Sequence, residues 1–409
     1  MMQLSRLPNG LRVASRQMPG VETVTVGLFA DVGSRHEAAR ENGLAHLFEH
    51  MVFKGAGGRS ARQIAEAVED VGGDLNAMTS RDATVFTARL IAGDLPLGLG
   101  IIADLVQRPH FDGAELAREK KVVLQELGEA RDTPGDIVFD HLQQAAFPGQ
   151  PLGASILGDE RTVGGLGVGD LNAWRESHYH ADNLVLIAAG KVDHDTLFSL
   201  GAAAFGGLPQ GAVPVAAPAR FGACDVVDAR SSEQVHIAIG YPAPAVRAPD
   251  YFAARLFAEA IGGGMSSRLF QELREERGLA YSVYASLQAF DDAGLMSVYL
   301  ATEPGDAPAA LALVGEVLAD AAASLTDAEL ERARALVKAG LLMSLESTEG
   351  QAAYLARQLW VHGRLVAPAD VVAQINAVRL ADVYAVAARI LAERPARAFV
   401  GSGAEALAA

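Results

Sequence analysis

The sequence predicts an α+β fold made of two homologous domains, each a mostly antiparallel β-sheet packed with helices. Three observations lead to this prediction. The chain has 409 residues, which is enough for two domains with a full core each. Hydrophobic residues make up 50% of it, as is typical of a globular protein. The second half of the chain also repeats a pattern of the first half, which indicates a tandem duplication.

The repeat is clearest in two short segments. Residues 45–51 read Ala-His-Leu-Phe-Glu-His-Met, and residues 254–260 read Ala-Arg-Leu-Phe-Ala-Glu-Ala. Glu115 pairs in the same way with Glu329, each near the start of a long charged helix. Residues 210–221 are rich in Pro and Ala and show no clear period, which is typical of a linker. We therefore expect an N-terminal domain at 1–209 and a C-terminal homologous domain at 222–409.

The elements of the first half follow from turn, capping and periodicity signals. A hairpin turn is expected at residues 8–10. Asn42 is expected to be the N-cap of the helix that carries residues 46–50, and Ser60 that of the next helix, which ends at the glycine pair 72–73. The other expected elements are strands at 22–31, 74–79, 84–91 and 184–189, and helices at 95–107, 113–130, 134–146, 169–178 and 195–204.

Composition and charge limit the classes of partner and the cellular location that we expect. The net charge of −16 argues against nucleic acid as a partner; it most simply keeps the protein soluble and also favours basic ligands. The single cysteine, Cys224, excludes disulfides within one chain and favours a reducing compartment. The N-terminus does not read as a signal peptide, and no apolar run approaches the ~20 residues that span a bilayer. We therefore expect a cytoplasmic protein with no membrane partner.

The stretch from His46 to His50 reads H-x-x-E-H, the inverted form of the zinc-protease helix motif. Residues four apart lie on one face of a helix, so the two imidazoles can bind one metal ion. Glu49 lies beside them and can reach a water molecule on that ion. The corresponding positions of the second half, residues 255, 258 and 259, are Arg, Ala and Glu. The repeat therefore predicts metal chemistry in the first domain and a second domain without metal ligands.

A third metal ligand must come from elsewhere, because catalytic zinc sites normally have three protein ligands. The helix expected at 113–130 is the candidate source, since Glu119 and Glu126 fall on nearly the same helical face. Spacing alone does not choose among its four carboxylates. These are Glu115, Glu119, Glu126 and Glu129.

These residues resemble the pitrilysin/insulinase family of zinc metallopeptidases (inverzincins), and most of all its two-domain branch, which includes the mitochondrial processing peptidases. The likeness extends over essentially the whole chain. In that family the third ligand is a Glu that lies 76 residues after the second His, and 50 plus 76 gives Glu126. An acidic residue seven positions earlier assists catalysis, which implies Glu119. The resemblance implies one Zn²⁺ per chain, bound by His46, His50 and Glu126, with Glu49 as the general base.

The resemblance also implies substrate-binding residues. Asn76 and Ala77 match the family's edge strand, to which an extended peptide adds as a further strand. Arg274 and Tyr281 match a substrate-positioning pair that acts in catalysis: Arg274 would hold a substrate carbonyl, and Tyr281 would donate a hydrogen bond to the scissile carbonyl or its oxyanion. Without the resemblance, Asn76 is more simply a turn residue, and the other two a surface Arg and a half-buried Tyr.

The predicted function is that of a zinc-dependent endopeptidase acting on extended peptides or unfolded segments. In the family, two two-domain halves close like a clamshell, with zinc in one half and the Arg–Tyr pair in the other. This chain carries both sets, which implies a homodimer whose sites are completed in trans. The acidic charge favours basic peptide substrates. Two alternatives remain: a catalytically silent peptide-binding or structural subunit of a processing-peptidase-like complex, and a metal hydrolase acting on a non-peptide bond.

Overall fold

The computed structural model describes residues 1–408 and contains two compact units. Each unit has one main β-sheet with helices packed on it, so the predicted α+β fold is confirmed. Unit 1 comprises Met1–Leu127, Ser155–Ala217 and Ser344–Val366. Unit 2 comprises Gly128–Ala154, Pro218–Met343 and the chain from Ala367 onward.

The sheet of unit 1 has six strands in the order β1-β2-β8-β3-β7-β6. Strands β2 and β8 are parallel, and all other neighbouring pairs are antiparallel. Every residue of β8 is buried, as expected for an apolar strand covered on both faces. Strand β6 is the last strand on its side, and alternate residues along it are exposed. The bounds are Met2–Arg6 (β1), Arg12–Gln17 (β2), Thr23–Ala30 (β3), Asp74–Thr79 (β6), Thr84–Ile91 (β7) and Leu184–Gly190 (β8). A short separate hairpin pairs Gly55–Ala56 (β4) with Arg59–Ser60 (β5).

Helices cover both faces of this sheet. Side chains alternate between faces along β8: Leu186 belongs to the core formed with α3 and α8, and Val185 and Ile187 pack on Leu355 of α12. Helix α1 packs against β6 and α7. The bounds are Leu44–Val52 (α1), Ala61–Glu69 (α2), Leu95–Gln107 (α3), Gly113–Asp132 (α4), Glu160–Gly165 (α6), Val168–His178 (α7), His194–Phe205 (α8) and Thr348–His362 (α12).

The sheet of unit 2 repeats this topology. Its order is β9-β13-β10-β12-β11, in which the first pair is parallel and the others are antiparallel, as in β2-β8-β3-β7-β6. The predicted duplication is therefore confirmed at the level of strand order and direction. The strand bounds are Asp225–Asp228 (β9), Val235–Ala243 (β10), Ser282–Ala289 (β11), Gly294–Thr302 (β12) and Ala396–Val400 (β13). The helix bounds are Tyr251–Gly262 (α9), Ala307–Ser324 (α10), Asp327–Ser344 (α11), Pro368–Ala377 (α13), Leu380–Leu391 (α14) and Glu405–Ala408 (α15).

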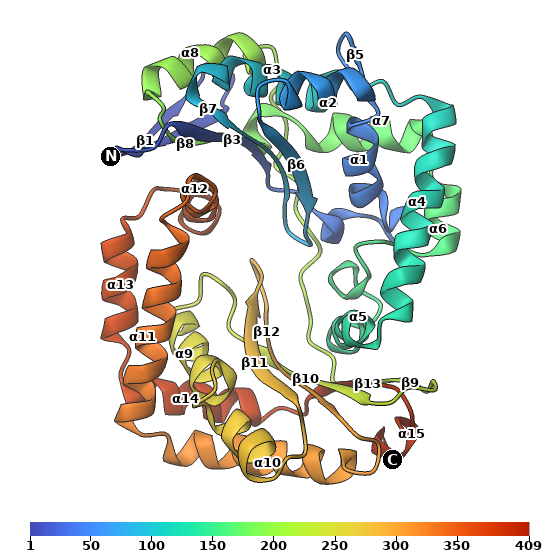
Figure 1. Cartoon of the computed structure of the whole chain (residues 1–409), viewed down its shortest axis with the longest axis vertical. Helices are drawn as coiled ribbons and strands as arrows, with labels where there is room; N and C mark the ends of the chain where they lie inside the picture. Colours follow the sequence, from blue (N-terminus) through green and yellow to red (C-terminus); the bar gives the residue numbers. More distant parts are fainter. Residues whose placement is uncertain (409) are drawn as a thin grey trace. The chain divides into compact units, whose positions relative to one another are not determined.

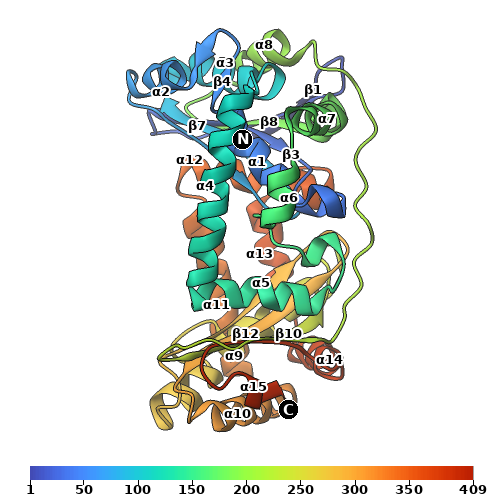
Figure 2. The same cartoon turned by 90° about the vertical axis from the view of Figure 1, so that its right-hand side faces the viewer.

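The two halves of the chain exchange a helix. Helix α5 (Pro134–Ala146) comes from the first half of the chain and packs on β10 and β13 of unit 2 (Figure 2). Helix α12 comes from the second half and packs on β2, β3 and β8 of unit 1 (Figure 1). The compact units are therefore discontinuous in sequence, whereas the division into 1–209 and 222–409 stays a prediction about the two halves of the chain. Residues 208–224 form no helix or strand, and one of the boundaries between the units, at 217/218, lies within the predicted linker.

Among residues 1–408, one helix is long and apolar enough to cross a membrane by length and composition alone. It is α10, and the pair α13–α14, bent by 81°, passes the same test as a broken span. A core helix of a soluble protein also passes this test, and α10 packs against α14 and residues 270–276 in unit 2. The absence of a membrane partner therefore stays a prediction.

Candidate metal centre

Helix α1 presents its polar residues on one side. It buries Leu47, Phe48 and four other apolar residues, while His46, Glu49 and His50 stay partly exposed. Because residues four apart share a helical face, the rings of His46 and His50 lie side by side, with centroids 4.6 Å apart. The apolar positions thus determine which way the two imidazoles point.

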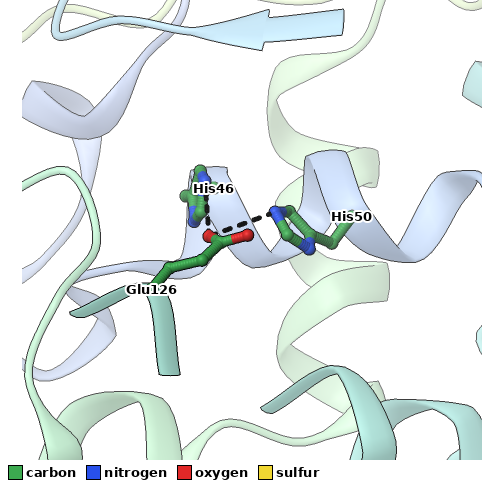
Figure 3. Close-up of side chains that lie close together, drawn as sticks. All are labelled: His46, His50 and Glu126. Carbon is green, nitrogen blue, oxygen red and sulfur yellow. Dashed lines mark ion pairs between the residues drawn. The ribbon is translucent and has the colours of Figure 1, made fainter. Parts of the chain in front are cut away.

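Helix α4 brings Glu126 between these two rings (Figure 3). Its Oε2 atom lies 3.8 Å from His46 Nε2 and 3.7 Å from His50 Nε2. Two donor atoms bound tetrahedrally to one Zn²⁺ at ~2.1 Å lie about 3.4 Å apart, so the three side chains are spaced nearly as a zinc site requires. Two imidazoles and one carboxylate are also a ligand set typical of catalytic zinc. Within residues 1–408 this is the one group of three His, Cys, Asp or Glu side chains close enough to share an ion.

Glu119 contacts His50 from the other side of the ring. Its Oε2 lies 3.2 Å from His50 Nδ1, and its Oε1 lies 2.7 Å from the Lys54 ammonium. An ionised carboxylate only accepts hydrogen bonds, so Nδ1 is the donor and Nε2 keeps its lone pair for a metal. Glu119 is only 6% exposed, and Lys54 offsets its buried charge. This geometry indicates that Glu119 orients the His50 ring and does not itself bind the metal.

His46 is held in the form that binds metal. Burial, and second the neighbouring His50, lower the pKa of His46 to about 4. The imidazole is therefore neutral at physiological pH, as a metal ligand must be. Its Nδ1 is buried and has no hydrogen-bond partner among residues 1–408.

Glu49 lies next to the ligand candidates on the same helix. Burial raises its pKa, while hydrogen bonds from Thr79, the last residue of β6, oppose the shift. A carboxylate with a raised pKa is a stronger base, which suits proton transfer near neutral pH. Its Oε2 atom is buried without a hydrogen-bond partner in the described part of the chain.

Asn76 and Ala77, the predicted substrate-binding residues, lie on the edge strand β6 beside α1. The Asn76 side chain accepts a hydrogen bond from the Ala77 amide at 2.9 Å, so these two residues already interact within the strand. The position of β6 agrees with the expected addition of a peptide strand; the roles of the two residues stay predictions.

Arg274 and Tyr281 come together in unit 2. The guanidinium carbon of Arg274 lies 4.6 Å from the centre of the Tyr281 ring and 4.7 Å from that of Phe270, within the range of cation–π contacts. Tyr281 is 73% exposed, which leaves its hydroxyl free to meet a ligand. Their substrate-positioning role stays a prediction. Sequence reasoning missed Phe270, because nothing in its local pattern distinguishes it from a core residue.

The prediction that Asn42 is the N-cap of α1 is wrong. The N-cap is Gly43, whose φ of +93° lies in the left-handed region. Asn42 instead donates to Glu37 and to the Ser155 carbonyl. The sequence reasoning also missed Glu37, which accepts from two amides at the start of α1, because capping rules consider only residues next to the helix.

The fold and this site are those of a zinc metallopeptidase family, and the comparisons with known proteins agree. The model of the family described as "Insulinase (Peptidase family M16)" matches residues 12–160. The model described as "Peptidase M16 inactive domain" matches residues 166–337, a segment that contains none of the three ligand candidates. The chain belongs to peptidase family M16, as its sequence resemblance predicted.

Relatives cover nearly the whole chain. A protein of Rickettsia bellii named "Uncharacterized zinc protease" is 33% identical and covers 97% of both chains. The "Mitochondrial-processing peptidase subunit beta" of Lentinula edodes is 34% identical over 95% of this chain and 87% of its own. The crystal structure of a protease from Helicobacter pylori superposes with a TM-score of 0.91 at 23% identity, covering 98% of this chain and 99% of that one, which supports the fold.

Proposed function

We propose that this protein is a zinc-dependent endopeptidase that hydrolyses extended peptides or unfolded segments, with one Zn²⁺ per chain. The convergence of His46, His50 and Glu126 beside Glu49 is the observation that supports this proposal most. When bound there, zinc supplies Lewis acidity and makes a water molecule more acidic. The names of the relatives, zinc protease and processing peptidase, agree with it.

The chain's own residues have distinct proposed tasks. Glu49 accepts the proton of the attacking water and later donates it to the leaving amine. Glu119 holds His50 in the tautomer whose Nε2 is free. The exposed phenol of Tyr281 donates a hydrogen bond to the oxygen on which charge develops, and Arg274 holds a substrate carbonyl. The peptide lies along the edge of β6, where main-chain hydrogen bonds tolerate many sequences.

The direct test is cleavage of a mixed peptide library, with and without a chelator, followed by mass-spectrometric mapping of the cut sites. We expect cleavage that the chelator abolishes and added Zn²⁺ restores. Basic peptides should be preferred at low ionic strength, because the chain carries a net charge of −16. A silent peptide-binding subunit would bind zinc and peptides but cut none. A hydrolase for non-peptide bonds would leave the library intact.

We also propose that the active form is a homodimer in which two copies enclose the peptide in a clamshell chamber. The support is that one chain has both the metal cluster and the Arg274–Tyr281 pair. In such a dimer the metal cluster of one copy works with the pair of the other. The exposed single cysteine, Cys224, agrees with the further proposal of a reducing, cytoplasmic location.

Mixing two inactive variants tests completion in trans. Glu49→Gln and Tyr281→Phe homodimers should each be inactive. If subunits exchange freely, half of the mixture is heterodimer, and one of its two sites combines an intact Glu49 with an intact Tyr281. We therefore expect recovery of about a quarter of wild-type activity on mixing. No recovery, despite heterodimers seen by native mass spectrometry, would contradict completion in trans.

A further inference from the structure

We propose that Glu37 is a positioning residue for the metal centre: its buried carboxylate caps helix α1 from outside and thereby fixes the first turn, which carries His46. The inference rests on the proposed function only for its zinc-binding readout. Its second readout, the protection of backbone amides, is independent of it.

Helix α1 has no side-chain cap of its own. The first N–H groups of a helix lack intrahelical partners, and its N-cap, Gly43, has no side chain to satisfy them. A larger residue is excluded there, because φ is +93° and an added Cβ would lie 2.9 Å from the carbonyl oxygen of Leu157. The usual capping residues therefore cannot occupy this position, and an acceptor has to come from elsewhere.

Glu37 provides that acceptor. Its Oε2 accepts from the Gly43 amide at 2.9 Å, and its Oε1 accepts from the Ala45 amide at 2.7 Å. The Asn42 side chain donates to Oε2 as well, at 3.1 Å, and its amide is held in turn by the Ser155 carbonyl. Glu37 is 4% exposed. Burial, the largest cause, raises the pKa of Glu37 to about 8, and the three N–H donors oppose this rise. The carboxyl oxygens accept from both amides whether or not the group is ionised. The ionised form, above that pH, also places a negative charge at the helix N-terminus, where it interacts favourably with the helix dipole.

The cap acts directly on the first turn of the metal helix. Ala45 precedes His46, so the bond from the Ala45 amide to Glu37 fixes the peptide unit that leads into His46. His50 lies one turn later, and its ring is held separately by the hydrogen bond between its Nδ1 and Glu119. Loss of Glu37 should therefore loosen His46 more than His50. Because a site that is formed only part of the time binds its ligand more weakly, the metal affinity should fall.

The experiment compares Glu37→Gln with Glu41→Gln. Both replace a carboxyl by an amide of the same size in the same loop, but Glu41 forms its ion pair with Arg40 and not with α1. Zinc affinity is measured by competition with a chromophoric chelator, and amide exchange by mass spectrometry of peptides covering residues 43–52. We expect about tenfold weaker zinc binding and faster exchange in Glu37→Gln, and wild-type values in Glu41→Gln.

Wild-type zinc affinity and exchange in Glu37→Gln would overturn the proposal, even if the enzyme cleaves peptides. If that variant does not fold, Glu37→Asp replaces it: the shorter side chain cannot reach both amides, so an intermediate loss of affinity is expected and a wild-type value contradicts the proposal. If the wild-type chain binds no zinc, the proposed function fails, whereas the exchange of residues 43–52 still decides whether Glu37 caps the helix.

Discussion

Helices α1 and α9 occupy equivalent places in the two units and differ in their polar residues. Both bury a Leu-Phe pair completely, at Leu47-Phe48 and Leu256-Phe257. Where α1 has two histidines four residues apart, α9 has Arg255 and Glu259, which form an ion pair at 3.5 Å.

Helices α4 and α11 differ in the same way. Counted from Glu115 and Glu329, the positions of Glu119 and Glu126 correspond to Ala333 and Gly340 of α11. The fold therefore depends on the buried faces of these helices, whereas the metal site depends on a few polar positions that the duplication could lose without losing the scaffold.

The sharpest test of this comparison is Glu49→Gln against Glu259→Gln. The first variant should keep zinc and lose about 10²–10⁴-fold in kcat, because the amide cannot accept a proton. The second alters a carboxylate of α9 and should leave the peptidase rate unchanged. Steady-state kinetics and metal analysis of both proteins measure this. Equal losses in the two variants would mean that both units take part in the proton transfer.

Replacing the third ligand candidate should weaken zinc binding without unfolding the protein. Glu126→Gln keeps the size of the side chain but removes the charge that faces His46 and His50. We expect zinc affinity to fall at least 100-fold, by more than the loss from an outer partner of a ligand. Dialysis against a chelator, followed by metal analysis and circular dichroism, separates metal loss from unfolding. Stoichiometric zinc after dialysis would show that residue 126 is no ligand.

Helices α5 and α12 should contribute about equally to the stability of the units on whose sheets they pack. Leu355 of α12 is fully buried on the sheet of unit 1, and Leu142 of α5 is 1% exposed on that of unit 2. Each Leu→Ala change should lower the free energy of unfolding by about 2–4 kcal/mol, through lost burial and a remaining cavity. Urea denaturation measures both variants. A loss under 1 kcal/mol in one of them would show that this unit does not depend on its exchanged helix.

The smallest expected effect concerns pH and the charged starts of α4 and α11. The Arg268 guanidinium, by hydrogen bonding, lowers the pKa of Glu329 to about 2. A depressed folded-state pKa stabilises the protein above the ordinary pKa of Glu, and this contribution is lost as the pH falls toward 2. After solvent screening we expect about 1 kcal/mol. The difference in stability between wild type and Glu329→Gln should therefore vanish on acidification. At the corresponding position of α4, the more exposed Arg118 also lowers the pKa of Glu115, so Glu115→Gln should show the same trend with a smaller difference.

Local signals predicted most of the fold. Strands 74–79 and 84–91 and helix 134–146 have the expected bounds, because turn residues, proline and periodicity mark their ends. Ser60 caps α2 as expected, since its hydroxyl accepts from an amide three residues later. These features depend on neighbours in sequence, which are visible without a structure.

The remaining features depend on contacts between distant residues. Spacing within α4 did not separate Glu126 from its neighbours; only the family resemblance did, and the structure now places it next to His46 and His50. An apolar face shows that α5 and α12 are buried but not which sheet covers them, so the exchange could not be predicted. The cap that Glu37 forms was invisible for the same reason.

The exchange of α5 and α12 has a consequence for any cut in the irregular segment 208–224. A protease that nicks the chain there would leave two fragments, and each would keep a helix that completes the sheet of the other. The fragments should therefore copurify as a split protein and separate only in denaturant. Neither fragment expressed alone would have a fully covered sheet, so each should aggregate until its counterpart is added.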